Sequence, residues 1–423
     1  MTTTKYGSLV ESAKQKRLNR KIFGMDSATL DFSMESLSAQ QNDLSVWARE
    51  LHIANQHITI KQDQIDAAAN AYEEIANHLV NELRWERNDI NIHPQGSSRT
   101  KTLINSPDAS KFDIDAVCQV NISRIDAHDP VSFFENIGRA LGKFEPNPKK
   151  RCWRIEFSGH RFYIEFTPSV PLSTVPVNIL DSVRYRPANN YGSTALAVVD
   201  TPTKNWKTSN PEGFANWVNE QAEKKLIIQI GLESAVLGKS FSIVPVPSQE
   251  VPLSDTLRVA IRLFKRHRDM AVRNGNLDCE HKPISVIIVT LLTQCYEGLA
   301  DIGATYLHPI QLLADLAELL PNMIEERGTE YWIANPTVEG ENFAERWNQD
   351  DGERRAAFEK WCDLLIDDLK SILKETEDNK IQERVRRVFG CTGADTSNPK
   401  PSAGLAPSAP TRVVPPPPTR GLA

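Results

Sequence analysis

The chain has 423 residues, of which 40% are hydrophobic and 25% charged, and its formal net charge is -6. This length predicts two or three domains with ample residues for a hydrophobic core, and the composition is ordinary for a globular protein. The acidic balance argues against a protein that coats nucleic acid through its overall charge, so no stable nucleic-acid partner is expected.

The cysteines and the apolar segments indicate the cellular setting. The six cysteines are scattered, with no Cys-x-x-Cys pair. This spacing favours a reduced, cytoplasmic protein over a disulfide scaffold or a zinc ribbon. The N-terminus lacks the apolar segment of a secretory signal, and the longest apolar run, Ile284 to Leu292, is too short to span a bilayer. No membrane association is expected.

The first elements along the chain are helical. Residues 1–60 are polar and weakly periodic, and they predict one or two short helices, one of them around Trp47. Apolar residues spaced by three or four then mark one face of a long helix from Ile65 to Leu83. The alternation from Asp89 to Ile92 predicts a strand that leads into a turn at 94–98.

Two further strand regions carry acidic residues. Residues 112–120 alternate so that Asp113 and Asp115 share one face of a strand, with apolar residues on the other. A hairpin with its turn at 158–160 follows, and Glu165 lies on the polar face of its second arm. Pro168 and Pro171 are expected to end that arm.

The second half predicts helices. Ser254 is a candidate N-cap, and the apolar run at 283–296 favours a helix by its length. Further helices are expected at 308–324 and 353–387. Past Gly390 the Pro-rich composition cannot bury a core, so residues 391–423 are expected to be a disordered tail.

The turn Gly96-Ser97-Ser98 is a candidate phosphate-binding loop. Glycine lets the backbone approach a phosphate closely, and the amides and hydroxyls that follow can donate to its oxygens. Alone this signal is weak, because most Gly-Ser-Ser segments are plain surface turns.

Asp113, Asp115 and Glu165 form the second candidate feature. Two carboxylates side by side repel each other unless a cation lies between them. Taken alone, the pair Asp113 and Asp115 is more typical of a solvated strand face, and Glu165 alone could be an exposed strand residue. Together, and in this order after the turn, the three acids fit two-metal phosphoryl transfer, in which carboxylates hold two magnesium ions and Glu165 is a ligand and proton acceptor.

Three segments carry a resemblance to a known family. PQGSSRTKT, KFDIDAVCQV and FYIEFTPSVP resemble the signature of the cGAS/DncV-like nucleotidyltransferases, the bacterial synthases that start cyclic-oligonucleotide-based antiphage defence. NWKTSNPEGFANWV, IRLFKRHRD, KPISVIIVTLL and WIANPTVEGENFAERW are similar to other segments of the family, so the resemblance covers residues 60–350. The third acid departs from the pattern, since it is Glu165 where aspartate is usual.

The resemblance implies a fold and a set of domains. It implies an α+β protein with a polymerase-β-like nucleotidyltransferase lobe around a mixed sheet, a helical OAS/cGAS-like C-terminal lobe, and an active site in the cleft between them. The expected units are an N-terminal helical segment (1–60), the nucleotidyltransferase core (61–225), the helical lobe (226–390) and the tail (391–423).

The resemblance also implies ligands and site residues. Two magnesium ions, with manganese as a substitute, would be held by the three acids, and the substrates would be nucleoside triphosphates, ATP, GTP or both. Gly96, Ser97 and Ser98 would hold the triphosphate, while Lys265 and Ser285 resemble positions that touch nucleotide phosphates. A surface lysine and a helix-terminal hydroxyl are the alternative interpretations of the last two, and Arg266, His267 and Arg268 would add a basic rim unless they form a solvated face.

The implied product is a cyclic di- or trinucleotide, and three alternatives stay open. The chain could transfer nucleotides to an RNA or to a protein, or it could be a catalytically inactive nucleotide-binding scaffold. The tail, which ends in Arg420-Gly421-Leu422-Ala423, would suit a partner that resembles a ubiquitin-transfer enzyme and conjugates the C-terminus. By composition alone the tail is an entropic linker.

Overall fold

The computed structural model describes residues 4–22, 41–108, 110–176, 186–227, 246–306 and 309–391. The predicted tail therefore lies outside the described residues, except for Cys391. Within the described ranges no helix is long and apolar enough to cross a membrane.

The elements alternate between helix and strand in the first half and are mostly helical in the second. The helices are α1 (Lys5–Ile22), α3 (Gln41–His57), α4 (Gln62–Leu83), α5 (Gly96–Arg99), α6 (Pro130–Ala140), α8 (Pro211–Ala222), α9 (Thr256–Arg273), α10 (Ser285–Asp301), α11 (Pro309–Leu319), α12 (Glu353–Leu373) and α13 (Asp378–Phe389). The strands of the main sheet are β1 (Ile90–Pro94), β2 (Phe112–Val120), β3 (Asn147–Pro148), β4 (Trp153–Glu156), β5 (Phe162–Pro171), β7 (Leu196–Asp200) and β8 (Asn205–Ser209). Two small ladders pair β9 (Glu325–Arg327) with β10 (Glu330–Trp332) and β6 (Arg186–Pro187) with β11 (Val338–Glu339).

The main sheet is mixed. Its strands run in the order β1-β2-β5-β4-β3, and β7 joins β5 to β8. β2 and β5 are parallel, whereas β1 with β2, β4 with β5 and β7 with β8 are antiparallel. The predicted α+β class with a mixed sheet is confirmed.

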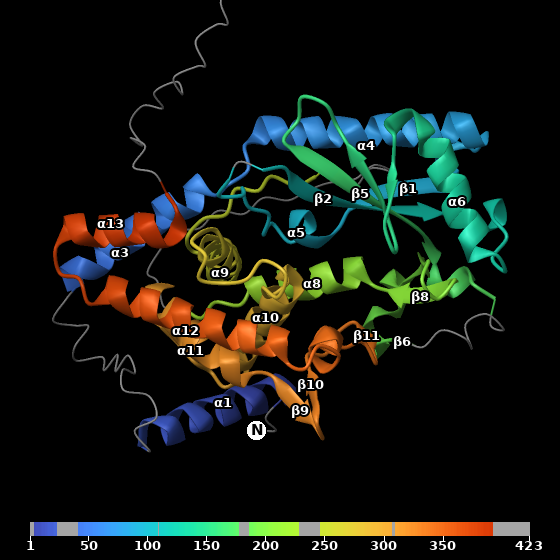
Figure 1. Cartoon of the computed structure of the whole chain (residues 1–423). Helices are drawn as coiled ribbons and strands as arrows, with labels where there is room; N and C mark the ends of the chain where they lie inside the picture. Colours follow the sequence, from blue (N-terminus) through green and yellow to red (C-terminus); the bar gives the residue numbers. More distant parts are fainter. Residues whose placement is uncertain are drawn as a thin grey trace, which may run out of the picture.

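One face of the sheet is buried under α4, as Figure 1 shows. Ile114 of β2 and Ile164 of β5 share a hydrophobic core with Ile65 and Leu79 of α4. Because strand side chains alternate between faces, the residues between these apolar ones point to the opposite side. That side faces α5 and, beyond it, α9 and α10 (Figure 1).

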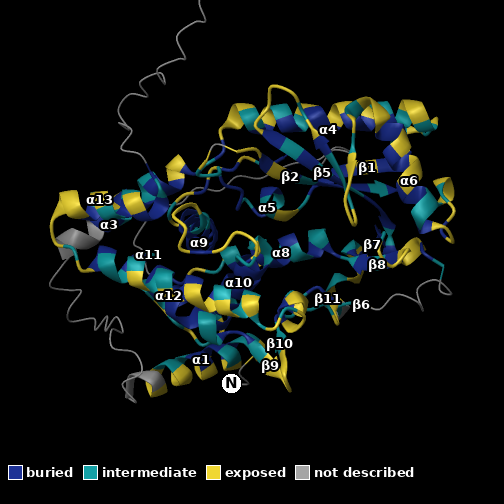
Figure 2. Ribbon diagram, in the orientation of Figure 1, coloured by how far each residue is buried: buried dark blue, intermediate teal, exposed yellow. Residues whose placement is uncertain are grey.

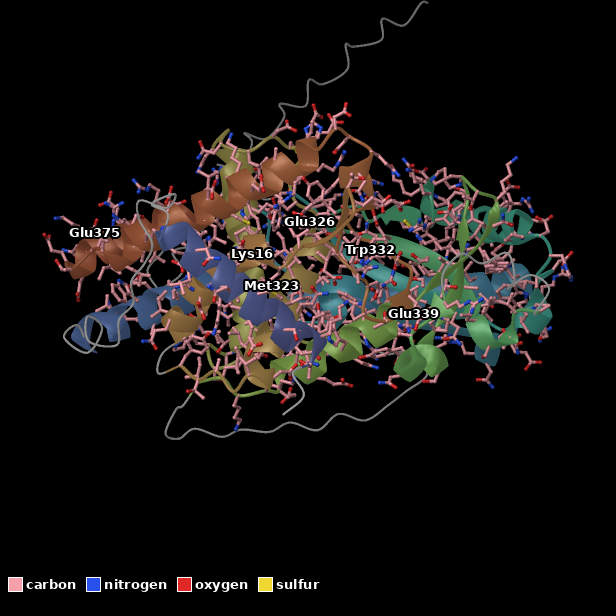
Figure 3. The ribbon with its side chains drawn as sticks, turned by 90° about the horizontal axis from the view of Figure 1, so that it is seen from below. Lys16, Met323, Glu326, Trp332, Glu339 and Glu375 are labelled. Atoms are coloured by element: carbon pink, nitrogen blue, oxygen red, sulfur yellow. The ribbon has the colours of Figure 1, made fainter. Side chains whose placement is uncertain are left out.

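The helical lobe has a core of its own around α9. Leu257, Ile261 and Phe264 of this helix are buried, and so are most of its other residues, as the dark blue α9 in Figure 2 shows. Trp217 of α8 and Trp47 of α3 belong to the same core. Seen from below, α1 crosses the underside of this lobe, on the side that carries Met323 (Figure 3). Both N-terminal helices therefore pack on the helical lobe, while the predicted domain boundaries stay a prediction.

Three local predictions were wrong. Pro168 lies within β5, because β5 pairs with β4 up to Phe166 and with β7 only from Ser169 onward, so the missing N–H falls where that edge has no partner. The N-cap of α9 is Asp255, whose side chain accepts from the Arg258 amide. The single helix expected at 353–387 is two helices, α12 and α13, with residues 374–377 between them.

Candidate active site

The three predicted acids lie on neighbouring strands. In the parallel pairing of β2 with β5, Asp115 is opposite Glu165 and Asp113 is opposite Tyr163. Residues paired in register point to the same face of a sheet, so the side chains of Asp113, Asp115 and Glu165 share the face turned away from α4. The structure brings together residues that are 50 positions apart in the chain.

The glycine turn lies directly against Asp115. Gly96 begins α5 with a φ of 57°, and a Cβ built at this position would overlap Oδ2 of Asp115. The amide of Gln95 donates to the carbonyl of Asp115 at 3.0 Å, which fixes the turn to β2. The Tyr72 hydroxyl of α4 donates to the same carbonyl, also at 3.0 Å. Only a residue without a side chain allows this approach of the turn to the carboxylate.

The surroundings of Asp115 disfavour a negative charge on its carboxyl group. Burial raises the pKa of Asp115 well above its usual range, the charges of Asp113 and Glu165 raise it further, and Lys265 lowers it. A carboxyl group placed in this way favours its neutral form until a cation arrives. The residues therefore suit a divalent ion, which would offset the repulsion among them.

This arrangement predicts that Asp115→Asn stabilises the metal-free protein. A raised pKa means that the folded state binds the proton more tightly than the unfolded chain, so Asp115 costs stability as the pH rises from about 4 through the folded-state value. In EDTA at pH 7.5 the variant should melt higher than the parent, by about 2–4 °C per kcal/mol. The gap should close towards pH 4.

Differential scanning fluorimetry from pH 4 to 8 measures this difference. Asp367→Asn, at an exposed position of α12, is the matched control and should leave the melting temperature unchanged. An Asp115→Asn protein that melts at or below the parental temperature at pH 7.5 would contradict the proposed repulsion.

The Glu165 side chain is held by a neighbouring arginine. Arg154, its register partner on β4, forms an ion pair with Glu165 at 2.7 Å, and the Arg154 guanidinium lies 4.2 Å from the centre of the Tyr163 ring. The Cys152 thiol is 3.8 Å from the same carboxylate, and its pKa is raised to about 12 by burial and by the charge of Glu165. In this orientation the Glu165 side chain does not line the cavity that opens beside Asp113 and Asp115.

A cavity of about 680 Å³ opens beside the acids, between the two lobes. Gly96, Ser97, Asp113 and Asp115 line it from the sheet side, and α9 and α10 line it from the helical side. Its volume lies within the range of small-molecule sites.

Lys265 and Ser285 both reach this cavity. Lys265 is 5% exposed and donates to the carbonyl of Thr102 at 2.9 Å, and burial together with the charge of Arg268 lowers its pKa to about 8. Ser285 begins α10, where its hydroxyl accepts from Arg268 at 3.1 Å. A buried lysine beside two aspartates differs from the surface lysine that was the alternative interpretation.

Three other residues named from the sequence lie differently. Ser98 is buried, and its hydroxyl donates to the carbonyl of Gln95 at 2.7 Å instead of facing the cavity. Arg266 donates to the carbonyls of Asn105, Phe389 and Gly390, so it ties α13 to the loop after α5. His267 contacts Asp368 and Trp361. Of the three candidates for a basic rim, only Arg268 lines the cavity.

Several cavity residues were not anticipated. Lys111, Arg273 and Lys282 add positive charge to the lining, and Phe214 and Phe343 add aromatic surface. Lys111 stands two residues before Asp113 and Lys282 three before Ser285, so position next to a motif was the available signal for them. Phe214 and Phe343 lie within NWKTSNPEGFANWV and WIANPTVEGENFAERW, so membership of these family-like segments was the available signal for them.

The three acids are the candidate ligands of a divalent metal ion. Across the described ranges, no three His, Cys, Asp or Glu side chains are close enough, as they now lie, to hold a metal ion. Asp113 and Asp115 offer the hard oxygen ligands that magnesium prefers. Glu165 can join them once its carboxylate turns away from Arg154.

Comparisons with known proteins agree with this architecture. No protein-family model matches the chain. It is similar to a curated c-di-GMP synthase of Roseivirga ehrenbergii, with 26% identity over 284 residues. The match covers 66% of this chain and 66% of the relative, just under two thirds of the relative's length. Among solved structures it is similar to the CD-NTase CdnG of Bradyrhizobium diazoefficiens in complex with GTP, with a TM-score of 0.54, 16% identity and coverage of 82% of this chain and 94% of that one.

A further similar structure is CdnC of E. coli MS115-1 in its CdnC:HORMA-deltaN complex. It has a TM-score of 0.52 and 13% identity, and the match covers 82% of this chain and 97% of that one. The fold is therefore that of the CD-NTases, an α+β nucleotidyltransferase fold. Together with the curated relative, these likenesses confirm the resemblance to the cGAS/DncV-like nucleotidyltransferases that the motifs predicted.

Proposed function

We propose that the chain is a magnesium-dependent synthase that joins nucleoside triphosphates into a cyclic di- or trinucleotide, as a signal in antiphage defence. The observation that carries the proposal is the pairing of Asp115 with Glu165 on adjacent parallel strands, with Gly96 packed against Asp115 at the edge of the cavity. Two-metal phosphoryl transfer uses side chains that hold the metal ions and groups that bind the phosphates.

The similar proteins support the substrate class. The curated relative is a c-di-GMP synthase, and the CdnG structure holds GTP. A second CdnC structure, with a TM-score of 0.52 and 12% identity, is described with ATP. A nucleoside triphosphate is therefore proposed as the ligand of the cavity in this chain.

The residues of the chain have distinct tasks in the proposed reaction. Asp113, Asp115 and Glu165 would hold two magnesium or manganese ions, which, when bound, offset phosphate charge and lower the pKa of the attacking ribose hydroxyl. The backbone amides that follow Gly96 would donate to the triphosphate oxygens. Glu165 would accept the proton of the ribose hydroxyl. The oxygen of that hydroxyl would attack the α-phosphorus, and pyrophosphate would leave.

The helical lobe would contact the triphosphate from the opposite side of the cavity. Lys265 faces the cavity from α9, close enough to Asp113 and Asp115 for their charges to act on it, and it would neutralise part of the triphosphate charge. Ser285 and Arg268 would add donors at the start of α10. Holding triphosphate and hydroxyl in line between two lobes provides much of the rate enhancement in such reactions.

Product analysis tests the proposal. Purified protein with all four nucleoside triphosphates and magnesium should release pyrophosphate and form a phosphatase-resistant product whose mass is that of a cyclic di- or trinucleotide. Labelled RNA or labelled protein as the product would instead show transfer to another acceptor. Calorimetric binding of magnesium nucleotide without any product would show an inactive scaffold.

The tail is proposed as the attachment point for a conjugating partner, and the setting as the cytoplasm. Both proposals follow from the family resemblance and from the composition of residues 391–423. The root of the tail is anchored, since the carbonyls of Phe389 and Gly390 accept from Arg266. Incubation with such an enzyme and mass spectrometry of the C-terminus test the conjugation.

A further inference from the structure

A polar and aromatic cluster lines the cavity in addition to the acids and the basic residues. Its members are Asn335, Glu341 and Phe343 of the helical lobe, together with Phe214 of α8. None of these residues has a task in the proposed phosphoryl transfer. Side chains of the cavity that are not engaged with the triphosphate can contact the part of a nucleotide that does not react, such as its base.

Glu341 is held in one orientation by two neighbours. Its Oε2 accepts from Nδ2 of Asn335 at 2.7 Å, and its Oε1 is 3.2 Å from Nζ of Lys207 on β8. Oδ1 of Asn335 accepts from both the amide and the hydroxyl of Thr337, each at 2.9 Å. Because the Asn335 oxygen is already occupied, its nitrogen must face Glu341.

This carboxylate still has acceptor capacity. Each carboxylate oxygen offers two lone pairs, and the two named contacts use one on each oxygen. Both side chains of the Lys207–Glu341 pair are largely buried, with 15% and 18% exposed. When a carboxylate is mostly withdrawn from solvent, a hydrogen bond to it discriminates between ligands that can donate to it and ligands that cannot.

Two phenylalanines line the same cavity as the carboxylate. Phe214 and Phe343 meet edge to face, with ring centroids 6.1 Å apart, and both are only partly buried. Partly exposed rings in a polar cavity suit stacking on a flat base, which tolerates any base. The choice between bases therefore depends on the polar group that meets the hydrogen-bonding edge of the base, which is the Glu341 carboxylate.

We infer that Glu341 selects guanine. The Watson–Crick edge of guanine presents two parallel donors, N1–H and the 2-amino group, one for each carboxylate oxygen, and each oxygen of Glu341 retains one lone pair beside its named contact. Adenine presents one donor beside the N1 acceptor, which would face a carboxylate lone pair. This inference rests on the proposed function and adds to it that at least one substrate is GTP.

Equilibrium binding of α,β-methylene analogues tests the inference, because these analogues cannot react. With magnesium present, the wild-type protein should bind the GTP analogue about 10- to 100-fold more tightly than the ATP analogue, the range of one bidentate base contact. The inosine analogue, which lacks the 2-amino group, should lie between them. Glu341→Gln should abolish the preference, because an amide replaces one acceptor with a donor.

Two control variants separate selection from general binding. Glu345→Gln, at an exposed position in the same segment and outside the cavity, should keep the full preference. Phe343→Leu should weaken both analogues to a similar extent and leave their ratio unchanged. If Glu341→Gln fails to fold, the wild-type ratios for the three analogues still test the inference, because equal binding of the GTP and ATP analogues would overturn it.

The outcomes are distinct. Equal binding of the GTP and ATP analogues, or a preference that Glu341→Gln leaves intact, overturns the assignment of Glu341 and leaves the proposed synthase untouched. Absence of binding for every analogue overturns both. A guanine preference that the Glu341 variant removes, with Glu345→Gln unchanged, supports the inference.

Discussion

Asp113→Asn is expected to lower pyrophosphate release by at least about 1,000-fold, or roughly 4 kcal/mol of transition-state stabilisation. The amide keeps the shape of the side chain and removes the charge that would hold a divalent ion. Asp113 is exposed on β2, so the variant should fold as the parent does. Its melting temperature in EDTA, measured beside the pyrophosphate assay, checks that the loss is chemical.

Glu156→Gln is the matched control for this experiment. Glu156 lies on β4 of the same sheet, is exposed, and pairs with Lys111 at 2.7 Å. The control changes the same charge on the same sheet without touching the three acids, and it should retain activity within about twofold. Full activity of Asp113→Asn would refute the active-site assignment.

Local patterns in the sequence predicted the elements that carry the acids. The alternation around Asp113 and Asp115 gave β2 with its bounds, and the periodicity after Ile65 gave α4. The family motifs then suggested that Glu165 joins the pair. The parallel pairing of β2 with β5 places Glu165 beside Asp115. This pairing joins strands that are distant in the chain, so no local sequence pattern predicts it.

Contacts between distant segments were beyond the reach of the sequence. The run of charged residues on α9 suggested a basic rim, but this helix is buried on nearly all sides. Arg266 therefore turns towards α13, and His267 turns towards α12. Glu341 meets Lys207 across 134 positions, between a loop and the last strand of the sheet. Periodicity reports how much of an element is buried and does not report which element covers it.

Substitution of Gly96, compared with a control glycine, separates the cost of backbone strain from the loss of catalysis. Gly96→Ala is expected to lower pyrophosphate release by at least about 100-fold, because the new methyl group must displace the Asp115 carboxylate, and small displacements of reacting groups are costly. The backbone adds a second penalty, since a φ of 57° is unfavourable for alanine by about 1 kcal/mol.

Gly159→Ala isolates that second penalty. Gly159 has a φ of 80° in the hairpin turn, and a Cβ there would meet nothing within 4 Å. The control should therefore lose thermal stability comparable to the backbone part of the Gly96 effect and keep its activity. If both alanine variants lost activity alike, or if Gly96→Ala kept it, the close approach of the turn to Asp115 would have no catalytic meaning. A large loss at Gly96 alone places the effect at the carboxylate, because the backbone strain is common to both variants.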